Sequence, residues 1–427
     1  MSTYPEKSRG ELISIRDQLR RDYETFKKRG LKLDMSRGKP GAEQLDLCEG
    51  MLTVLSRNVD CFSPGGTDCR NYGLLDGIPE ARELFAELLG VSPEEVIAAG
   101  NSSLSLMYDA VMRAMYLGVA GGEPWAREGK VRFLCPVPGY DRHFSVCEAF
   151  GIEMLTVDMT PAGPDMDAVE RLVSTDASIK GIWCVPMYSN PQGITYSDDT
   201  VRRFARLKPA AKNFRIFWDN AYFIHHLGAE HDTLLNILDE CKAAGNPDLV
   251  YIFASTSKIS YPGAGVAVVA ASKTNIDHIK KQISIQTIGP DKLNQLRHVR
   301  FFGSAEGVRE HMKKHAKCLS PKFGAVLARL DAELSGLGIA FWNRPRGGYF
   351  ISLDTIDGCA KRTLALLSDA GVAMTPAGAT FPYGRDPRDR NIRIAPTFPP
   401  VGELETAAEL FCLCVKLAAV EKLLETP

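Results

Sequence analysis

The segment Leu249-Val250-Tyr251-Ile252-Phe253-Ala254-Ser255-Thr256-Ser257-Lys258 runs from an apolar, strand-like stretch into a serine-rich turn that ends at a lysine. Two polar motifs precede it, Ser189-Asn190-Pro191-Gln192-Gly193 and Asp219-Asn220-Ala221-Tyr222, and each follows an apolar stretch of its own. Ligands of mainly parallel sheets bind beyond the carboxyl ends of the strands. Because all three polar motifs occur at such ends, we expect them to meet at one pocket.

The chemical groups in these motifs suit a substituted pyridine that carries an aldehyde. We expect Lys258 to form a Schiff base with pyridoxal 5′-phosphate and then to remove the substrate's alpha proton as a general base. Asp219 would keep the ring nitrogen protonated, while Asn190 and Tyr222 would donate hydrogen bonds to the phenolic oxygen. The predicted catalytic residues are therefore Lys258, Asp219 and Tyr222.

Each motif alone has an ordinary structural explanation. Asp219 could cap a helix, the segment around Asn190 could be a simple turn, and a lysine beside serines is usually solvated surface. Their joint occurrence, in one order and each after a strand-like stretch, favours a shared site.

On these motifs the chain resembles the class I aminotransferases of pyridoxal phosphate fold type I, from about Met35 to the C-terminus. The resemblance implies that the cofactor phosphate binds after Gly100, where main-chain N–H groups and hydroxyls at a helix start suit a dianion. Tyr140 would stack on the ring, and Tyr72 would reach the phosphate of a neighbouring subunit, which implies a homodimer. The cofactor-binding residues it implies are Asn101, Ser102, Ser103, Tyr140, Asn190, Asp219, Tyr222, Ser255, Ser257, Lys258 and Tyr72.

The resemblance also implies three substrate-binding residues: Gly38, Asn190 and Arg393. Arg393 would grip the substrate's alpha carboxylate as a bidentate fork. The family usually has an arginine shortly after the lysine to pair with the phosphate, whereas this chain reads Tyr261-Pro262-Gly263-Ala264-Gly265-Val266. Lys292 and Arg300 are the alternative cations, at positions from which related enzymes send residues across the dimer interface.

A divergent subgroup, the MocR-like aminotransferases, which includes bacterial aspartate aminotransferases, shares further motifs with this chain. They are Ser36-Arg37-Gly38-Lys39-Pro40, Ser255-Thr256-Ser257-Lys258, Pro262-Gly263-Ala264-Gly265 and Ile288-Gly289-Pro290-Asp291-Lys292-Leu293-Asn294. The resemblance implies aspartate:2-oxoglutarate transamination by a ping-pong Schiff-base mechanism, with amino acids and keto acids as substrates. A dicarboxylate also needs a second cation, for which Arg37, Lys39 and Lys292 are candidates.

Other functions compete with this interpretation. Alanine:glyoxylate or aromatic amino acid transfer is the main alternative, and a pyridoxal phosphate lyase or decarboxylase would use the same residues. A MocR-type sensor domain is disfavoured because about thirty-five residues precede Met35, too few for a winged helix and a linker.

Charge and composition bound the possibilities further. The chain has 427 residues with 51 basic and 52 acidic side chains, a net charge of −1 that argues against a nucleic-acid partner. The mixed-charge segment Met1 to Arg16 lacks the apolar core of a secretory signal, and no stretch of eighteen apolar residues is present. We expect a cytoplasmic protein with no membrane partner.

Cysteines and histidines give little support for a metal site. The eleven cysteines contain no C-x-x-C pair and favour reduced thiols. His311 and His315 lie four apart in a lysine-rich stretch, and we expect a solvated helix face there. The side chains of the adjacent His225 and His226 should diverge. The sequence therefore predicts no metal.

Short apolar stretches alternate with amphipathic ones, which is typical of an α/β fold with a mostly parallel sheet flanked by helices. Seven strands are predicted, at residues 96–99, 131–135, 152–157, 181–185, 214–218, 249–253 and 265–270. The last follows its neighbour after only about a dozen residues, so we expect it to be antiparallel.

We expect three segments along the chain. Residues 1–45 would join a small domain, residues 46–300 would form the large cofactor-binding domain, and residues 301–427 would form the smaller α+β domain. Within the last segment we expect a long helix interrupted at Pro321 and a terminal helix over residues 402–424.

Overall fold

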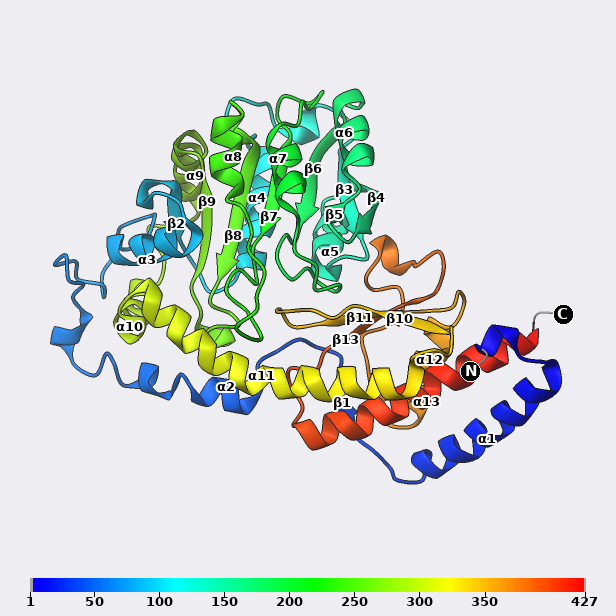
Figure 1. Cartoon of the computed structure of the whole chain (residues 1–427). Helices are drawn as coiled ribbons and strands as arrows, with labels where there is room; N and C mark the ends of the chain where they lie inside the picture. The colour runs from blue at the N-terminus through cyan, green and yellow to red at the C-terminus, as the bar shows by residue number, and fades with distance from the viewer. Residues whose placement is uncertain (1–2, 426–427) are drawn as a thin grey trace.

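Buried β-branched and aromatic residues form the central sheet of the computed structural model, which describes residues 3–425 (Figure 1). Its strands are β2 (Val96–Ala98), β3 (Arg132–Val137), β4 (Glu153–Thr160), β5 (Gly163–Pro164), β6 (Ile179–Cys184), β7 (Arg215–Asp219), β8 (Val250–Ser255) and β9 (Ala267–Ala271). They lie in the order β2-β9-β8-β7-β6-β3-β4-β5. Strands β4, β3, β6, β7 and β8 are parallel, whereas β9 is antiparallel to both of its neighbours. The direction predicted for the strand after Lys258 is confirmed.

The sheet has eight strands rather than the seven that the sequence predicts. The added strand, β5, is two residues long and pairs antiparallel with the end of β4 at the edge of the sheet. Two residues cannot show an alternation of apolar and polar side chains, and proline is tolerated only at sheet edges. The predicted α/β class, with a mostly parallel sheet and a smaller α+β part, is confirmed.

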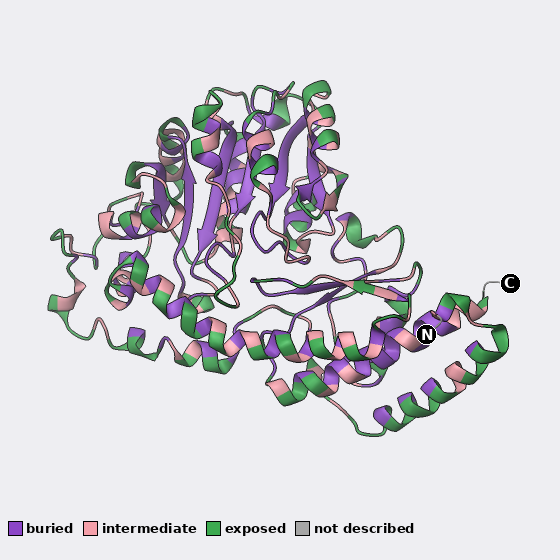
Figure 2. Ribbon diagram, in the orientation of Figure 1, coloured by how far each residue is buried: buried purple, intermediate pink, exposed green. Residues whose placement is uncertain are grey.

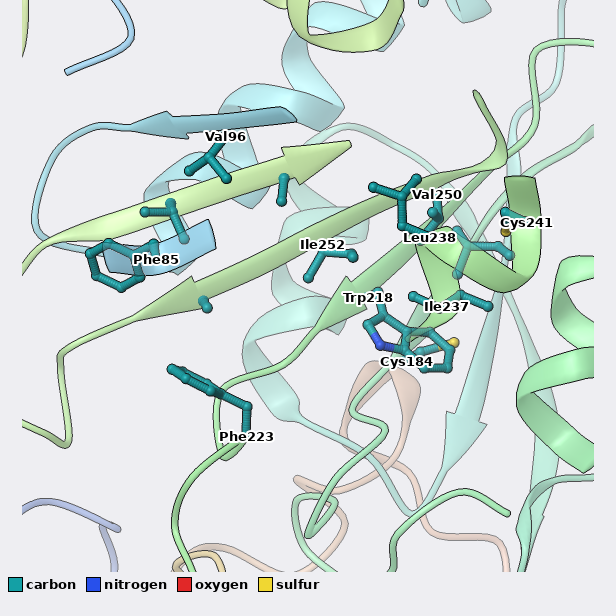
Figure 3. Packing of buried hydrophobic residues seen from close by; sticks show 14 of the residues in the cluster. Phe85, Val96, Cys184, Trp218, Phe223, Ile237, Leu238, Cys241, Val250 and Ile252 are labelled. Carbon is teal, nitrogen blue, oxygen red and sulfur yellow. The ribbon is translucent and has the colours of Figure 1, made fainter. Parts of the chain in front are cut away.

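Helices cover both faces of the sheet, and alternate residues of each strand supply two separate cores. The helices are α3 (Pro79–Leu89), α4 (Ser103–Tyr116), α5 (Asp141–Ala149), α6 (Met166–Thr175), α7 (Asp198–Ala205), α8 (Ile237–Ala243), α9 (Lys273–Gln286) and α10 (Lys292–Phe302). Ile216 and Trp218 pack with α3, α6, α7, α8 and α10, whereas Phe217 packs with α4, α5 and α9. Figure 2 shows the strands buried between these layers, and Figure 3 shows part of the first core around Trp218 and Ile252.

The second part of the molecule is built from both ends of the chain. It contains α1 (Arg9–Lys27), β1 (Leu33–Asp34), α2 (Ala42–Asp46), α11 (Ala305–Leu334), β10 (Ala340–Trp342), β11 (Ile351–Thr355), α12 (Ala360–Asp369), β12 (Val372–Ala373), β13 (Asn391–Ile394) and α13 (Val401–Glu425). Strand β1 pairs with β12, and β10, β11 and β13 form an antiparallel sheet. One hydrophobic core contains buried side chains from residues 4–35 and from residues 323–420. This shared core supports the proposal that residues 1–45 belong to the small domain.

Helix α11 takes part in both units. Ala305 and Met312 pack in the core of the large sheet, whereas Phe323 and Leu334 pack in the other core, so a boundary at residue 300 remains a proposal. The predicted interruption at Pro321 is wrong. The proline lies exposed inside a continuous helix, and burial of its neighbours offsets the missing backbone hydrogen bond. Within residues 3–425, none of the helices has the length and apolar character to cross a membrane.

Candidate active site

A cavity of about 600 Å³ lies at the carboxyl ends of the parallel strands and is bordered by both parts of the molecule. Asp219 ends β7 and Ser255 ends β8, while Tyr140 and Asn190 follow β3 and β6. The predicted residues that line the cavity are Gly38, Ser102, Ser103, Tyr140, Asn190, Asp219, Tyr222, Ser255, Ser257, Lys258 and Arg393. The three motifs therefore meet at one pocket, and the role of each residue in it remains a prediction.

Asp219 is buried and uses only one of its carboxylate oxygens within the protein. Oδ2 lies 3.0 Å from Nε2 of His143, and Oδ1 has no hydrogen-bond partner among the described residues. His143 is held by stacking on Trp183, with ring centroids 4.4 Å apart. One oxygen thus remains for a cationic ligand. Sequence reasoning missed His143, whose one signal is its position three residues after Tyr140 at the start of a helix.

The amine of Lys258 lies over two tyrosine rings. Its Nζ is 5.1 Å from the ring centroid of Tyr222 and 5.7 Å from that of Tyr349. Burial lowers the pKa of Lys258, and the charge of Asp219 partly opposes this shift. Burial also raises the pKa of Tyr222 well above its ordinary value, so the hydroxyl remains a hydrogen-bond donor near neutral pH. A lowered lysine pKa favours the unprotonated amine that a nucleophile or a base requires.

Hydroxyl groups gather where α4 begins and β8 ends. Ser102 is the N-cap of α4, and its Oγ accepts a hydrogen bond from the backbone N–H of Ser105. Ser255 Oγ donates to Ser257 Oγ at 3.0 Å. The start of a helix carries partial positive charge and unpaired N–H groups. This corner of the cavity is therefore suited to an anion such as a phosphate.

Arg393 on β13 projects into the cavity with a fixed guanidinium. Nη1 donates to Asp141 Oδ1 at 3.0 Å and to Asn190 Oδ1 at 3.1 Å, and Nη2 donates to Thr375 Oγ1 at 3.3 Å. The group also lies 4.8 Å from the ring centroid of Phe350. Because arginine can only donate, the Asn190 amide must present its oxygen to Arg393, which leaves its NH₂ as a free donor.

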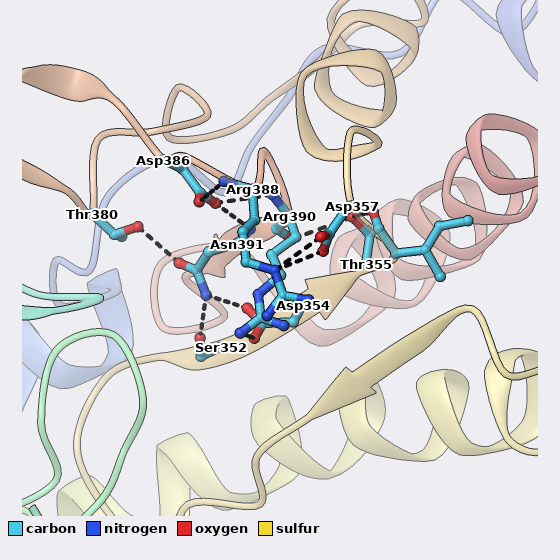
Figure 4. A network of polar contacts seen from close by, with 10 residues as sticks. Ser352, Asp354, Thr355, Asp357, Thr380, Asp386, Arg388, Arg390 and Asn391 are labelled. Atoms are coloured by element: carbon cyan, nitrogen blue, oxygen red, sulfur yellow. Dashed lines mark hydrogen bonds and ion pairs between the residues drawn. The ribbon is translucent and has the colours of Figure 1, made fainter. Parts of the chain in front are cut away.

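A polar network holds the strand that carries Arg393. Asn391 lies two residues earlier, on the same face of β13, and its Nδ2 donates to Ser352 Oγ at 2.9 Å and to Asp354 Oδ1 at 2.7 Å. Its Oδ1 accepts a hydrogen bond from Thr380 at 2.8 Å. Figure 4 shows that the network ties the loop before β13 to the neighbouring strand β11. The position of the guanidinium is therefore set by the sheet rather than by a mobile loop.

Gly38 lines the cavity at a crowded point. A Cβ atom at this position would lie 2.5 Å from the ring of Phe350, which in turn lies under Arg393. A side chain here would displace that ring.

Four predicted residues lie outside the cavity. Tyr72 is 82% exposed, and the side chain of Asn101 donates to a main-chain carbonyl at 3.4 Å. The ammonium of Lys292 and the guanidinium of Arg300 also donate to main-chain carbonyls, at 3.0 and 2.9 Å. Lys292 therefore does not supply a second cation to the cavity of its own chain, and a role for Tyr72, Lys292 or Arg300 requires a second subunit.

Three other cations line the cavity. Arg37 and Arg142 are exposed and make no ion pair or side-chain hydrogen bond with the described part of the chain. Lys39 also lines the cavity, but its ammonium lies 3.8 Å from the ring centroid of Phe398. Arg142 was missed from the sequence because it matches no motif, although it follows Tyr140 by two residues.

The predicted solvated face for His311 and His315 is wrong. Both are buried, with 5% and 1% exposure, because α11 turns this face toward Cys48 while the neighbouring Lys313, Lys314 and Lys317 are exposed. Burial lowers the pKa of His311, and it lowers the pKa of His315 to about 3. Both imidazoles are therefore neutral near pH 7.

The comparison with known protein families settles which family this site belongs to. A family model described as aspartate amino-transferase matches residues 7–426. The chain belongs to the aspartate aminotransferase family. An aspartate aminotransferase from Corynebacterium glutamicum is 46% identical over 406 residues, which cover 95% of this chain and 94% of that protein.

Solved structures agree with this family. A crystal structure of an aspartate transaminase from Corynebacterium glutamicum has a TM-score of 0.96 at 45% identity, covering 99% of both chains. LysN, an α-aminoadipate aminotransferase from Thermus thermophilus complexed with N-(5′-phosphopyridoxyl)-L-leucine, shares the fold with a TM-score of 0.74 at 21% identity, covering 92% of this chain and 94% of that one. This member of the aspartate aminotransferase family is a pyridoxal phosphate-dependent aminotransferase of fold type I. The MocR-like subgroup stays a prediction.

Proposed function

We propose that this aminotransferase moves the amino group of aspartate to 2-oxoglutarate, in a ping-pong sequence in which one product leaves before the second substrate binds. The observation that carries the proposal is that Arg393, Arg37 and Arg142 line one cavity. Arg393, only 7% exposed, is suited to the alpha carboxylate that every amino acid carries. The two unpaired guanidiniums suit a second carboxylate. Alanine, glyoxylate and aromatic side chains offer them no charge.

The residues of the cavity fit pyridoxal phosphate. The unpartnered Oδ1 of Asp219 suits a protonated pyridine nitrogen, and the free NH₂ of Asn190 and the hydroxyl of Tyr222 suit the phenolic oxygen. Ser102 and Ser255, at the start of α4 and the end of β8, suit the phosphate. When bound, this cofactor supplies an aldehyde and a ring that stabilises negative charge at the substrate's alpha carbon.

With the cofactor bound, side chains of this protein would transfer the substrate's alpha proton, keep the ring nitrogen protonated and orient the alpha carboxylate. Lys258, with its lowered pKa, would take the proton from the substrate's alpha carbon and return it to the adjacent cofactor carbon. Asp219 would hold the proton on the ring nitrogen, and its contact with His143 would keep the carboxylate in place. Arg393 would keep the alpha carboxylate oriented so that the proton faces Lys258.

We also propose that the active enzyme is a homodimer with shared sites. Tyr72 is 82% exposed in a single chain and lies outside that chain's cavity. The ammonium of Lys292 donates a hydrogen bond to the carbonyl oxygen of Gly73 at 3.0 Å. Because Gly73 follows Tyr72, this contact supports the segment that carries Tyr72. In a dimer, the Tyr72 hydroxyl would complete the phosphate site of the other subunit.

One assay tests the proposed reaction. The holoenzyme is mixed with aspartate and 2-oxoglutarate, and oxaloacetate, glutamate, ammonia and carbon dioxide are measured. Equal amounts of oxaloacetate and glutamate are expected, with no turnover when the keto acid is omitted. Release of ammonia or carbon dioxide without an acceptor would show a lyase or a decarboxylase instead. Faster transfer from alanine or phenylalanine than from aspartate would contradict the proposed substrate.

A further inference from the structure

A second cluster of reactive side chains lies behind the loop that carries Lys258. Cys48 follows α2, and His311 and His315 are four residues apart on one face of α11. All three residues are buried, and one potential ligand atom from each lies within 4.8 Å of the others. The carbonyl oxygen of Ile259, the residue after Lys258, lies in the same cluster at 2.9 Å from Nε2 of His311. Thiol, imidazole and carbonyl groups are all ligands of divalent metals.

The spacing of these atoms resembles the edges of a small tetrahedron. Zinc binds sulfur at about 2.3 Å and nitrogen at about 2.0–2.1 Å, which in a tetrahedron separates sulfur from nitrogen by about 3.6 Å and nitrogen from nitrogen by about 3.3 Å. Cys48 Sγ lies 3.6 Å from Nε2 of His311 and 3.7 Å from the Ile259 oxygen. The Nε2 atoms of His311 and His315 are 3.0 Å apart. Four contacts among these donor atoms, from 2.9 to 3.7 Å, are thus close to the edges of a tetrahedral zinc site, and the ligand atoms of Cys48 and His315 lie within 4.8 Å of each other.

With the Gln44 amide in its observed orientation, hydrogen bonds fit this cluster badly. Gln44 Oε1 accepts from the backbone N–H of Gly41, so its NH₂ faces Nδ1 of His315 at 2.9 Å, and that Nδ1 must be an acceptor. The proton of neutral His315 then lies on Nε2 and is donated to Nε2 of His311. Nε2 of His311 is left without a proton, although it lies 2.9 Å from the carbonyl oxygen of Ile259. Two acceptors therefore face each other in a buried place.

Turning the Gln44 amide over removes this conflict and also opens the cluster to a cation. If the Gln44 amide is turned over, its oxygen accepts from Nδ1–H of His315, and Nε2 of His315 presents a lone pair to the centre. Such an outer hydrogen bond is typical of metal-bound histidine. Turning the amide over costs the 3.2 Å hydrogen bond from Gly41, and it reverses the 2.9 Å contact with Tyr349, whose hydroxyl must then donate to Gln44. All four central atoms can then direct lone pairs to one ion.

We propose that Cys48, His311 and His315 form a buried zinc site, with the carbonyl oxygen of Ile259 as the fourth ligand. Binding of Zn²⁺ replaces the thiol proton of Cys48, which passes to solvent, and no group is oxidised or reduced. Four protein ligands leave no open position, so the ion has a structural role. Because Ile259 follows Lys258, the ion fixes the loop that carries the active-site amine.

Metal analysis of the holoenzyme tests this site directly. The protein is equilibrated with zinc, dialysed against metal-free buffer and analysed by mass spectrometry for metal and protein. About one zinc per chain is expected. Cys48→Ser and His315→Gln should lose the bound zinc, whereas Cys318→Ser, at a partly exposed cysteine on the same helix α11, should retain it. A wild-type chain without zinc, or zinc retained in both Cys48→Ser and His315→Gln, would overturn the proposal.

A spectroscopic measurement keeps the test valid if the variants fold poorly. Wild-type holoenzyme loaded with Co²⁺ in place of zinc should show the strong d–d absorption of a tetrahedral thiolate site in the red part of the visible spectrum, away from the cofactor. Added Zn²⁺ should abolish this absorption while the cofactor spectrum remains. Weak bands typical of octahedral cobalt would contradict a site with a thiolate and two imidazoles.

Discussion

At the scale of single residues, the unpartnered oxygen of Asp219 is the proposed partner of the cofactor's ring nitrogen. Replacing Asp219 with Asn removes the negative charge that would hold a proton on the ring nitrogen, while the shape of the side chain is kept. Breaking such a buried pair typically costs about 3–5 kcal/mol, so kcat should fall by at least about 100-fold. Steady-state kinetics and thermal unfolding check this, with Asp198→Asn on the surface as the control. Near wild-type turnover with Asp219→Asn would contradict the assigned role.

Specificity is also decided by single residues. Arg37→Gln and Arg142→Gln should each lower kcat/KM for aspartate by about 10-fold or more, since a charge-assisted hydrogen bond contributes about 1.5–3 kcal/mol. The kcat/KM for alanine should change little, because alanine has no second carboxylate. Lys39→Gln is the matched control, since this cation lines the same cavity but rests on Phe398. Equal losses of kcat/KM for aspartate and alanine would show that the two arginines do not recognise the side chain of the substrate.

Sequence reasoning predicted that motif residues at strand ends, such as Lys258 and Asp219, meet at one pocket, and both line the cavity. It missed partners that are joined only by folding. The contact between His143 and Asp219 spans 76 residues, and that between Cys48 and His311 spans 263 residues. No local spacing rule covers such pairs. The lysines around His311 and His315 led to the wrong prediction of a solvated face, because these lysines occupy the opposite face of the same helix.

At the scale of secondary-structure elements, helix α10 supports the loop that carries Lys258. Nε2 of His298 on α10 lies 2.8 Å from Ser260 Oγ and 3.2 Å from Thr256 Oγ1. The other ring nitrogen, Nδ1, donates a hydrogen bond to the carbonyl oxygen of Asn294 at 2.7 Å. Burial lowers the pKa of His298 to about 4. The neutral ring therefore accepts hydrogen bonds from hydroxyl groups on the loop that carries Lys258, while its Nδ1 anchors it to α10.

This contact predicts a dependence of stability on pH. Between pH 6.5 and about 4 the unfolded chain binds a proton at His298 that the folded chain does not, so the free energy of unfolding should fall as the pH falls through this window. The contribution is on the order of 3 kcal/mol. Urea unfolding of the wild type and of His298→Gln at several pH values measures it, with the exposed His231→Gln as the control. Identical pH slopes for the wild type and His298→Gln would exclude this explanation.

The long elements could be predicted from the sequence because their physical signals are strong. Buried parallel strands give continuous apolar stretches, and β7 over Arg215–Asp219 lies within one residue of the strand predicted at residues 214–218. Strand β5 is too short for any pattern, and Pro321 is accommodated inside α11 because packing of the helix outweighs a local preference. Local rules therefore failed where tertiary contacts or sheet edges decide the structure.

At the scale of the whole molecule, the proposed dimer predicts complementation between two damaged chains. Tyr72→Phe should weaken cofactor binding by about 10-fold or more, through loss of a hydrogen bond to a charged phosphate. Lys258→Ala should be inactive. Co-expressed, the two variants should form a mixed dimer with one intact site, which has Lys258 from one chain and Tyr72 from the other. At limiting cofactor, the mixture should exceed either parent in activity. No gain over the parents would show that Tyr72 does not act across an interface.

In the proposed mechanism, the amine of Lys258 is the group that holds the cofactor. Reduction of the holoenzyme with borohydride, followed by proteolysis and mass spectrometry, tests it most directly. A phosphopyridoxyl group is expected on the peptide that contains Lys258, and on no other lysine. A label on a different lysine, or a chain that remains unlabelled although it is saturated with pyridoxal phosphate, would contradict it.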